Sequence, residues 1–167
     1  VEVQVNRDAQ TGAITSGTVI FDVNYRFPSG VTLTGLHIHN GAAGANGPIV
    51  IDSGISPTPV TNVIRGNIFR IVEITSSNTG GIATLNGLFT DPTQYYINLH
   101  TTVNPGGVIR GQLSKNLFVF FNLMTQAEEV PPTGASGTAN SMTYVRVDRD
   151  STGNITGGEV SFNLNYN

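Results

Sequence analysis

Residues 18–25 read TVIFDVNY and residues 159–166 read EVSFNLNY, and apolar and polar side chains alternate in both stretches. This alternation predicts strands that bury one face and expose the other. No stretch has a convincing helical period. Further stretches of strand character, each bounded by Gly, Pro, Asn or Ser, lie at residues 1–5, 32–40, 48–52, 67–75, 82–89, 95–101, 108–113, 116–125 and 138–147. About ten short strands at roughly even spacing predict an all-β, antiparallel sandwich or barrel.

The same strand pattern belongs to an internal repeat. Residues 11–26 (TGAITSGTVIFDVNYR) and residues 152–167 (TGNITGGEVSFNLNYN) are identical at nine of sixteen positions, with a period of 141 residues. We therefore expect residues 1–116 to be the later part of one unit and residues 117–167 the opening part of the next. Either the chain is an arbitrary piece of a tandem array, or its trailing strands complete their own unit or a neighbouring copy by strand addition.

Composition and charge exclude several classes of function. The chain has eight basic and eleven acidic residues, a net charge of −3 and a single lysine, Lys115. Such a chain is not expected to bind nucleic acid or an anionic membrane surface. Its longest apolar stretch, residues 117–124, is far shorter than the roughly 20 residues of a membrane-spanning helix, so we expect no membrane insertion. The absence of cysteine excludes disulfides and thiolate metal sites. A composition rich in Thr and Asn and poor in Lys favours an extracellular or cell-surface location.

All three histidines of the chain lie in two strand-like segments. His37 and His39 are two residues apart, so their side chains share one face of a strand, and His100 ends another predicted strand. If these strands are neighbours, the three imidazoles form a nitrogen-rich site suited to copper or zinc. The alternative is a hydrogen-bonded histidine cluster that holds no metal.

Three segments carry a family resemblance: residues 36–50 (LHIHNGAAGANGPIV), 96–113 (YINLHTTVNPGGVIRGQL) and 128–133 (EEVPPT). They resemble the CHRD domain, the module named for chordin. The resemblance implies an extracellular, tandemly repeated, Greek-key immunoglobulin-like β-sandwich. The EVPP-like segment opens the family's unit but here follows the other two, as an offset piece of a repeat would.

The His-x-His strand also resembles that of copper-zinc superoxide dismutase, another β-sandwich. That enzyme's paired metals need more histidines than the three present here, together with a disulfide that this chain cannot form. We therefore do not expect superoxide dismutation, and no other catalytic constellation is evident.

Two further features have structural interpretations. Gly106 and Gly107 of the NPGG segment predict a tight turn between strands. Arg110, which follows this turn, is expected either to pair with Glu129 and pin a sheet edge or to form a weak solvated pair.

The segment 148–159 (DRDSTGNITGGE) offers oxygen ligands at the spacing of a calcium loop. A second, weaker hypothesis is therefore a calcium site. The alternative is a plain hairpin with an Asp-rich turn, because the repeat copy at residues 6–18 does not keep the ligands. The candidate calcium ligands are Asp148, Asp150, Thr152, Asn154 and Glu159.

Two functional hypotheses follow. The first is a non-enzymatic extracellular repeat module for assembly, adhesion or matrix and filament structure, whose partners are copies of itself or other extracellular proteins. The second is a copper- or zinc-binding protein in which His37, His39 and His100 serve a redox or metal-sequestering role.

Overall fold

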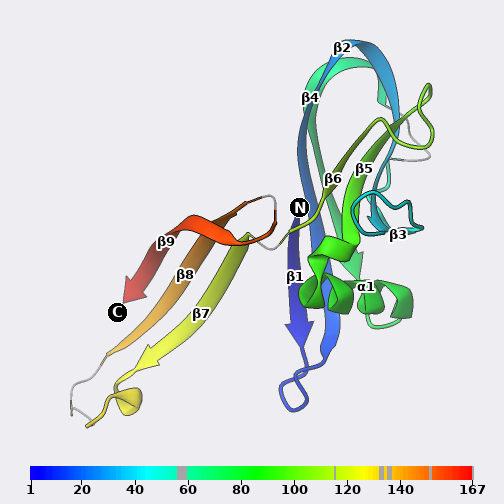
Figure 1. The fold of residues 1–167 in the computed structure, drawn as a ribbon. Coiled ribbons are helices and arrows are strands. Elements are labelled where there is room, and N and C mark those ends of the chain that lie inside the picture. Colours follow the sequence, from blue (N-terminus) through cyan, green and yellow to red (C-terminus); the bar gives the residue numbers. More distant parts are fainter. Residues whose placement is uncertain (56–59, 115, 132–133, 135–136, 151, 167) are drawn as a thin grey trace. The chain divides into compact units, whose positions relative to one another are not determined.

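The computed structural model describes the chain apart from residues 56–59, 115, 132–133, 135–136, 151 and 167. The chain divides into two compact units, residues 1–114 and residues 115–167 (Figure 1).

Within the described residues, the first unit contains six strands, one α-helix and one short 3₁₀-helix. All of its strand pairs are antiparallel. The strand order is β1-β2-β5-β6, and β3 and β4 also pair with β2. In chain order the elements are β1 (Glu2–Arg7), β2 (Ile14–Asn40), β3 (Ile49–Asp52), β4 (Val60–Ile74), α1 (Thr79–Thr90), η1 (Pro92–Gln94), β5 (Tyr95–Thr101) and β6 (Ile109–Gln112).

Strand β2 organises this unit because it changes neighbours along its 27 residues. Its first part lies between β1 and β4, where Val19 pairs with Val3 on one side and Val72 on the other. Its last part, residues 37–39, lies between β3 and β5. Register shifts between residues 26 and 33 mark the bend between these parts. A long strand that bends and pairs with different neighbours on either side of the bend is typical of a β-sandwich, and the described strand pairs are all antiparallel, so the predicted all-β, antiparallel sandwich class is confirmed.

The alternating side chains of β2 form the centre of the core. Val19 and Phe21 are 0% exposed, whereas Asp22 faces solvent. Fully burying one such apolar side chain contributes about 1.5–3 kcal/mol relative to leaving it in water. Apolar side chains from β3, β4, α1 and β5 complete the cluster, among them Ile51, Ile68, Ile74, Leu85, Leu88 and Leu99.

The helix α1 shows that one prediction was wrong, since residues 82–89 were assigned to a strand. The helix begins after Asn78, whose side-chain oxygen accepts a hydrogen bond from the Gly81 N–H at 2.9 Å. Glycine at position 81 lowers helix propensity but permits close packing, because a Cβ there would lie 2.7 Å from Ile74 Cγ2. The buried positions follow helical spacing: Gly81, Thr84, Leu85 and Leu88.

The other predicted strands correspond to observed ones, with residues 18–25 and 32–40 joined in β2. In its described residues, the second unit forms a three-stranded antiparallel sheet of order β7-β8-β9. Its elements are β7 (Leu117–Thr125), η2 (Gln126–Glu128), β8 (Thr138–Arg149) and β9 (Ile155–Tyr166). Within the described part of the chain, no helix has the length and apolar character needed to cross a membrane.

Candidate metal centre

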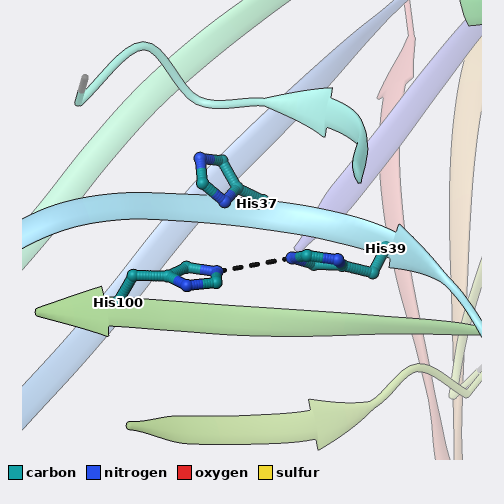
Figure 2. A group of neighbouring side chains, drawn as sticks. All are labelled: His37, His39 and His100. Carbon is teal, nitrogen blue, oxygen red and sulfur yellow. Dashed lines mark hydrogen bonds between the residues drawn. The ribbon is translucent and has the colours of Figure 1, made fainter. Parts of the chain in front are cut away.

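Three imidazoles meet where the last part of β2 pairs with β5 (Figure 2). His37 and His39 come from β2, and His100 comes from β5, where it pairs with Gly35. Their candidate ligand atoms all lie within 4.8 Å of one another. Each residue is only 7–8% exposed. The structure therefore brings together all three histidines that the sequence singled out, in a group that could hold a metal ion.

Hydrogen bonds define the tautomers of two of these rings. His39 Nδ1 lies 2.9 Å from the Gly47 carbonyl oxygen, and His100 Nδ1 lies 2.9 Å from the Pro105 carbonyl oxygen. A carbonyl oxygen only accepts hydrogen bonds, so both Nδ1 atoms carry the hydrogen. In the neutral rings, each Nε2 then presents a lone pair. Donation of Nδ1–H to a backbone carbonyl is also the usual support of a metal-binding histidine.

The two lone pairs point at each other. His39 Nε2 and His100 Nε2 are 3.3 Å apart, the contact drawn as a dashed line in Figure 2. A hydrogen bond across this gap requires one ring to be a cation. A metal ion satisfies both neutral rings, because metal–nitrogen bonds of about 2.0–2.1 Å at a tetrahedral angle place two nitrogens about 3.3 Å apart.

His37 completes the group from the neighbouring position on β2. Its Nε2 lies 3.6 Å from Asp52 Oδ1, and Asp52 is its Cα partner on β3. Burial lowers the pKa of His37; Asp52 opposes this shift, and His100 and His39 add to it. A lowered pKa keeps the ring neutral near pH 7, which is the form that binds a metal.

Gly35 makes room for the His37 ring. A Cβ at this position would lie 2.5 Å from His37 Cε1 and 2.8 Å from its Nε2. Since residues 35, 37 and 39 share one face of β2, a larger residue at position 35 would displace the ring.

The predicted glycine turn also belongs to this site. Gly107 has a φ of 115°, a value that favours glycine. Its N–H donates to the Asn104 carbonyl at 3.1 Å. This turn presents the Pro105 carbonyl to His100, while Gly106 accepts a hydrogen bond from the Asn98 amide at 3.4 Å. The turn residues therefore fix the orientation of one candidate ligand.

Arg110 supports the loop that orients His39. Its guanidinium lies 3.6 Å from the centroid of the Tyr96 ring, and that ring stacks on His39 with an interplanar angle of 8°. The same guanidinium donates to the Ala45 carbonyl at 3.0 Å and to Asn46 Oδ1 at 3.3 Å. Its predicted pairing with Glu129, which belongs to the second unit, stays a prediction.

Three of the candidate calcium ligands form the turn between β8 and β9. Asp150 Oδ1 accepts hydrogen bonds from the Thr152 hydroxyl at 2.7 Å, the Thr152 N–H at 2.9 Å and the Asn154 N–H at 3.0 Å. These hydrogen bonds, that of the Thr152 hydroxyl above all, lower the pKa of Asp150 to about 2. The geometry is that of the Asp-rich hairpin turn expected as the alternative.

The remaining two candidate calcium ligands face an arginine. Asp148 Oδ1 lies 2.7 Å from Arg146, and Glu159 Oε2 lies 3.7 Å from the same guanidinium. Calcium binding here stays a prediction, and a calcium ion would have to compete with Arg146 for these carboxylates. Among the described residues, the three histidines are the one group of His, Asp or Glu side chains gathered closely enough to hold an ion.

These features define a class of protein: an all-β, antiparallel module with a buried group of three histidines. The family model of the CHRD domain matches residues 2–113. Because this match covers more than half of the chain, the chain belongs to the CHRD domain family. No curated protein and no solved structure matches the chain. The family resemblance is thereby confirmed, whereas the tandem-repeat form stays a prediction.

Proposed function

We propose that this chain is an extracellular, non-enzymatic module that binds one copper or zinc ion through His37, His39 and His100. The pair of facing Nε2 atoms, 3.3 Å apart, is the observation that carries the proposal. The ion joins β2 to β5, two strands that are distant in sequence, and so adds binding free energy to folding. An imidazole site suits copper and zinc better than magnesium or calcium.

A structural role for the ion is favoured over redox turnover or metal delivery. All three histidines are more than nine-tenths buried, and catalysis requires a coordination position that substrate or water can reach. The redox and sequestering roles form the alternative within this proposal. Cycles of oxidation and reduction by the copper-loaded protein would favour that alternative.

Elemental analysis tests metal binding directly. Chelator-treated protein is dialysed against a small excess of zinc or copper, freed of unbound ion, and analysed for metal per chain. We expect about one ion per chain, and much less in a His100→Ala variant, because each structural metal site needs its complete ligand set. Equal metal content in both proteins, or none in either, would overturn the proposal.

A second candidate function is assembly, and it rests on the second unit. In the internal repeat, Val160 and Phe162 occupy the places of Val19 and Phe21. The first pair is 53% and 76% exposed, whereas the second pair is 0% exposed. An apolar face of this kind marks an interaction surface. We propose that a second copy of the chain, or another extracellular protein, covers it by strand addition in an adhesive or filamentous assembly.

The two hairpins are closely equivalent, which makes this comparison of exposure meaningful. Arg7 donates to the Gly12 carbonyl at 2.8 Å in the β1–β2 hairpin, and Arg149 donates to the Gly153 carbonyl at 2.8 Å in the β8–β9 hairpin. Each hairpin has a register shift beside this arginine. The second unit therefore repeats the local structure of the first, but its own described residues supply no apolar cover for this face.

Sedimentation velocity over a range of protein concentrations tests assembly. We expect the native chain to associate and a Phe162→Asn variant to associate less. The matched control is Phe69→Asn, because Phe69 is also exposed, at 53%, but lies on β4 of the first unit. A native chain that stays monomeric, or equal loss of association in both variants, would count against this function.

A further inference from the structure

His37 differs from the other two histidines in its hydrogen bonds. His39 and His100 each donate from Nδ1 to a backbone carbonyl. His37 Nδ1, in contrast, is buried without a hydrogen-bond partner among the described residues. A buried polar atom without a partner is rare in folded proteins and calls for an explanation, such as an ion that is bound there.

The other ring nitrogen of His37 faces a carboxylate. Asp52 Oδ1 lies 3.6 Å from His37 Nε2, and the same oxygen accepts a hydrogen bond from the Gly54 N–H at 2.8 Å. This second contact fixes the carboxylate in front of the ring. A carboxylate accepts and does not donate, so it favours the tautomer with hydrogen on Nε2. The lone pair of His37 then resides on Nδ1.

We infer that His37 binds the ion through Nδ1, whereas His39 and His100 bind through Nε2, and that Asp52 is the positioning residue that selects this mode. The inference rests on the proposed metal binding and specifies its chemistry. A carboxylate that orients a ligating imidazole raises its basicity as well as fixing its tautomer. Asp52 is thereby assigned a role, and β3 joins β2 and β5 in forming the site.

The opposite mode fits the structure less well. If His37 bound through Nε2, its Nδ1 would remain buried without a partner. The Asp52 carboxylate would then lie beside the ion as a further ligand. The half-exposed side chain of Asp52, 49% accessible to solvent, and its hydrogen bond to the Gly54 N–H favour an outer position.

Nitrogen NMR distinguishes the two modes. The full chain contains only three histidines, so selective ¹⁵N-histidine labelling gives spectra of this site alone. Zinc addition is expected to change the shifts of Nε2 in His39 and His100 and of Nδ1 in His37. The signals that disappear in a His37→Asn variant identify the two ring nitrogens of His37. A metal-induced shift that is larger at His37 Nε2 than at His37 Nδ1 would overturn the inference.

Zinc affinity measured by competition with a chelator tests the role of Asp52. Asp52→Ala is expected to weaken binding about 10- to 100-fold, and Asp52→Glu to retain most of it. The control is Asp22→Ala, since Asp22 is an exposed residue of β2 that bonds to Asn67 instead of a histidine. The NMR tautomer of His37 should change in Asp52→Ala only.

The possible failures are distinguishable. A native protein that binds neither zinc nor copper stoichiometrically would remove both the proposed function and this inference. The native protein could instead bind one zinc ion, while Asp52→Ala binds zinc with the same affinity and has the same His37 nitrogen shifts as the native protein. That result would leave metal binding intact and refute the role of Asp52.

Discussion

Replacing Gly35 with alanine is expected to disable the histidine site while preserving the fold. The new Cβ would lie 2.5 Å from His37 Cε1 and 2.8 Å from its Nε2, where ordinary contact begins near 3.4 Å. The imidazole must therefore move by about 0.6–0.9 Å, because the ring is the mobile end of its side chain. Metal–ligand distances in a bound site lie within about 0.2 Å of their ideal values, so a new Cβ that restricts the position of the His37 ring weakens binding.

The size of the effect follows from binding linkage. Zinc at about 1,000 times its dissociation constant stabilises the native protein by about 4.1 kcal/mol. A 100-fold loss of affinity removes about 2.7 kcal/mol of this stabilisation, or about 10 °C of melting temperature for a unit of this size. In the chelated variant, the smaller chain entropy of alanine relative to glycine opposes the cost of displacing the buried ring, so its melting temperature should stay near that of the chelated native protein.

Thermal melts with zinc and with chelator measure this difference within each protein, so any change in intrinsic stability cancels. The matched control is Gly111→Ala on β6, where a new Cβ would meet only Ile97 Cγ2 at 3.8 Å. We expect the control to keep the full zinc response. A Gly35→Ala protein with the native zinc response would refute the packing argument, and an equal loss in Gly111→Ala would show that the effect is not local.

Three further predictions concern pH and assembly. Chelated protein should lose stability as the pH falls through about 6.5, because burial lowers the pKa of His37 in the folded state and the unfolded chain then binds the additional proton. Urea unfolding at about pH 5 and about pH 7.5 measures this loss, and His37→Asn should reduce it. Carboxyl NMR should give Asp150 a pKa of about 2. The stability that its carboxylate adds is fully present above pH 3.8 and is lost as the pH falls toward 2. A value near 3.8 would contradict the hydrogen bonds of this turn. Removing residues 117–167 should lower the melting temperature of the preceding unit or abolish association, and a truncated chain with unchanged melting and sedimentation would contradict the assembly function.

The three histidines were predictable because their chemistry is encoded locally. Two residues on one strand at a spacing of two must share a face, and only one other histidine was present to join them. The groups that orient these rings were not predictable in the same way. Gly47 and Pro105 act through backbone carbonyls, which carry no side-chain signature, and Asp52 reaches His37 only because β3 pairs with β2. Gly35, two residues before His37, is a sequence signal of the space that the His37 ring needs.

The strand prediction succeeded for each described strand, including β5, which is buried on both faces, and β7, which is largely exposed. It failed at residues 82–89, where buried positions follow the helical period and glycine serves close packing against β4. It also divided β2 into two strands, because the bend between residues 26 and 33 has the composition of a turn. Local patterns define a strand's faces, whereas continuity through a bend depends on the neighbours that pair on either side.

The continuity of β2 has a mechanical consequence. A single strand of 27 residues leads from the β1–β2 turn to the histidine group without interruption. Tension applied at the turn is therefore transmitted along one backbone to the place where β2 meets β5. An ion held between these strands would resist their separation. Metal loading should therefore raise the force at which the first unit unfolds when it is pulled at the β1–β2 turn.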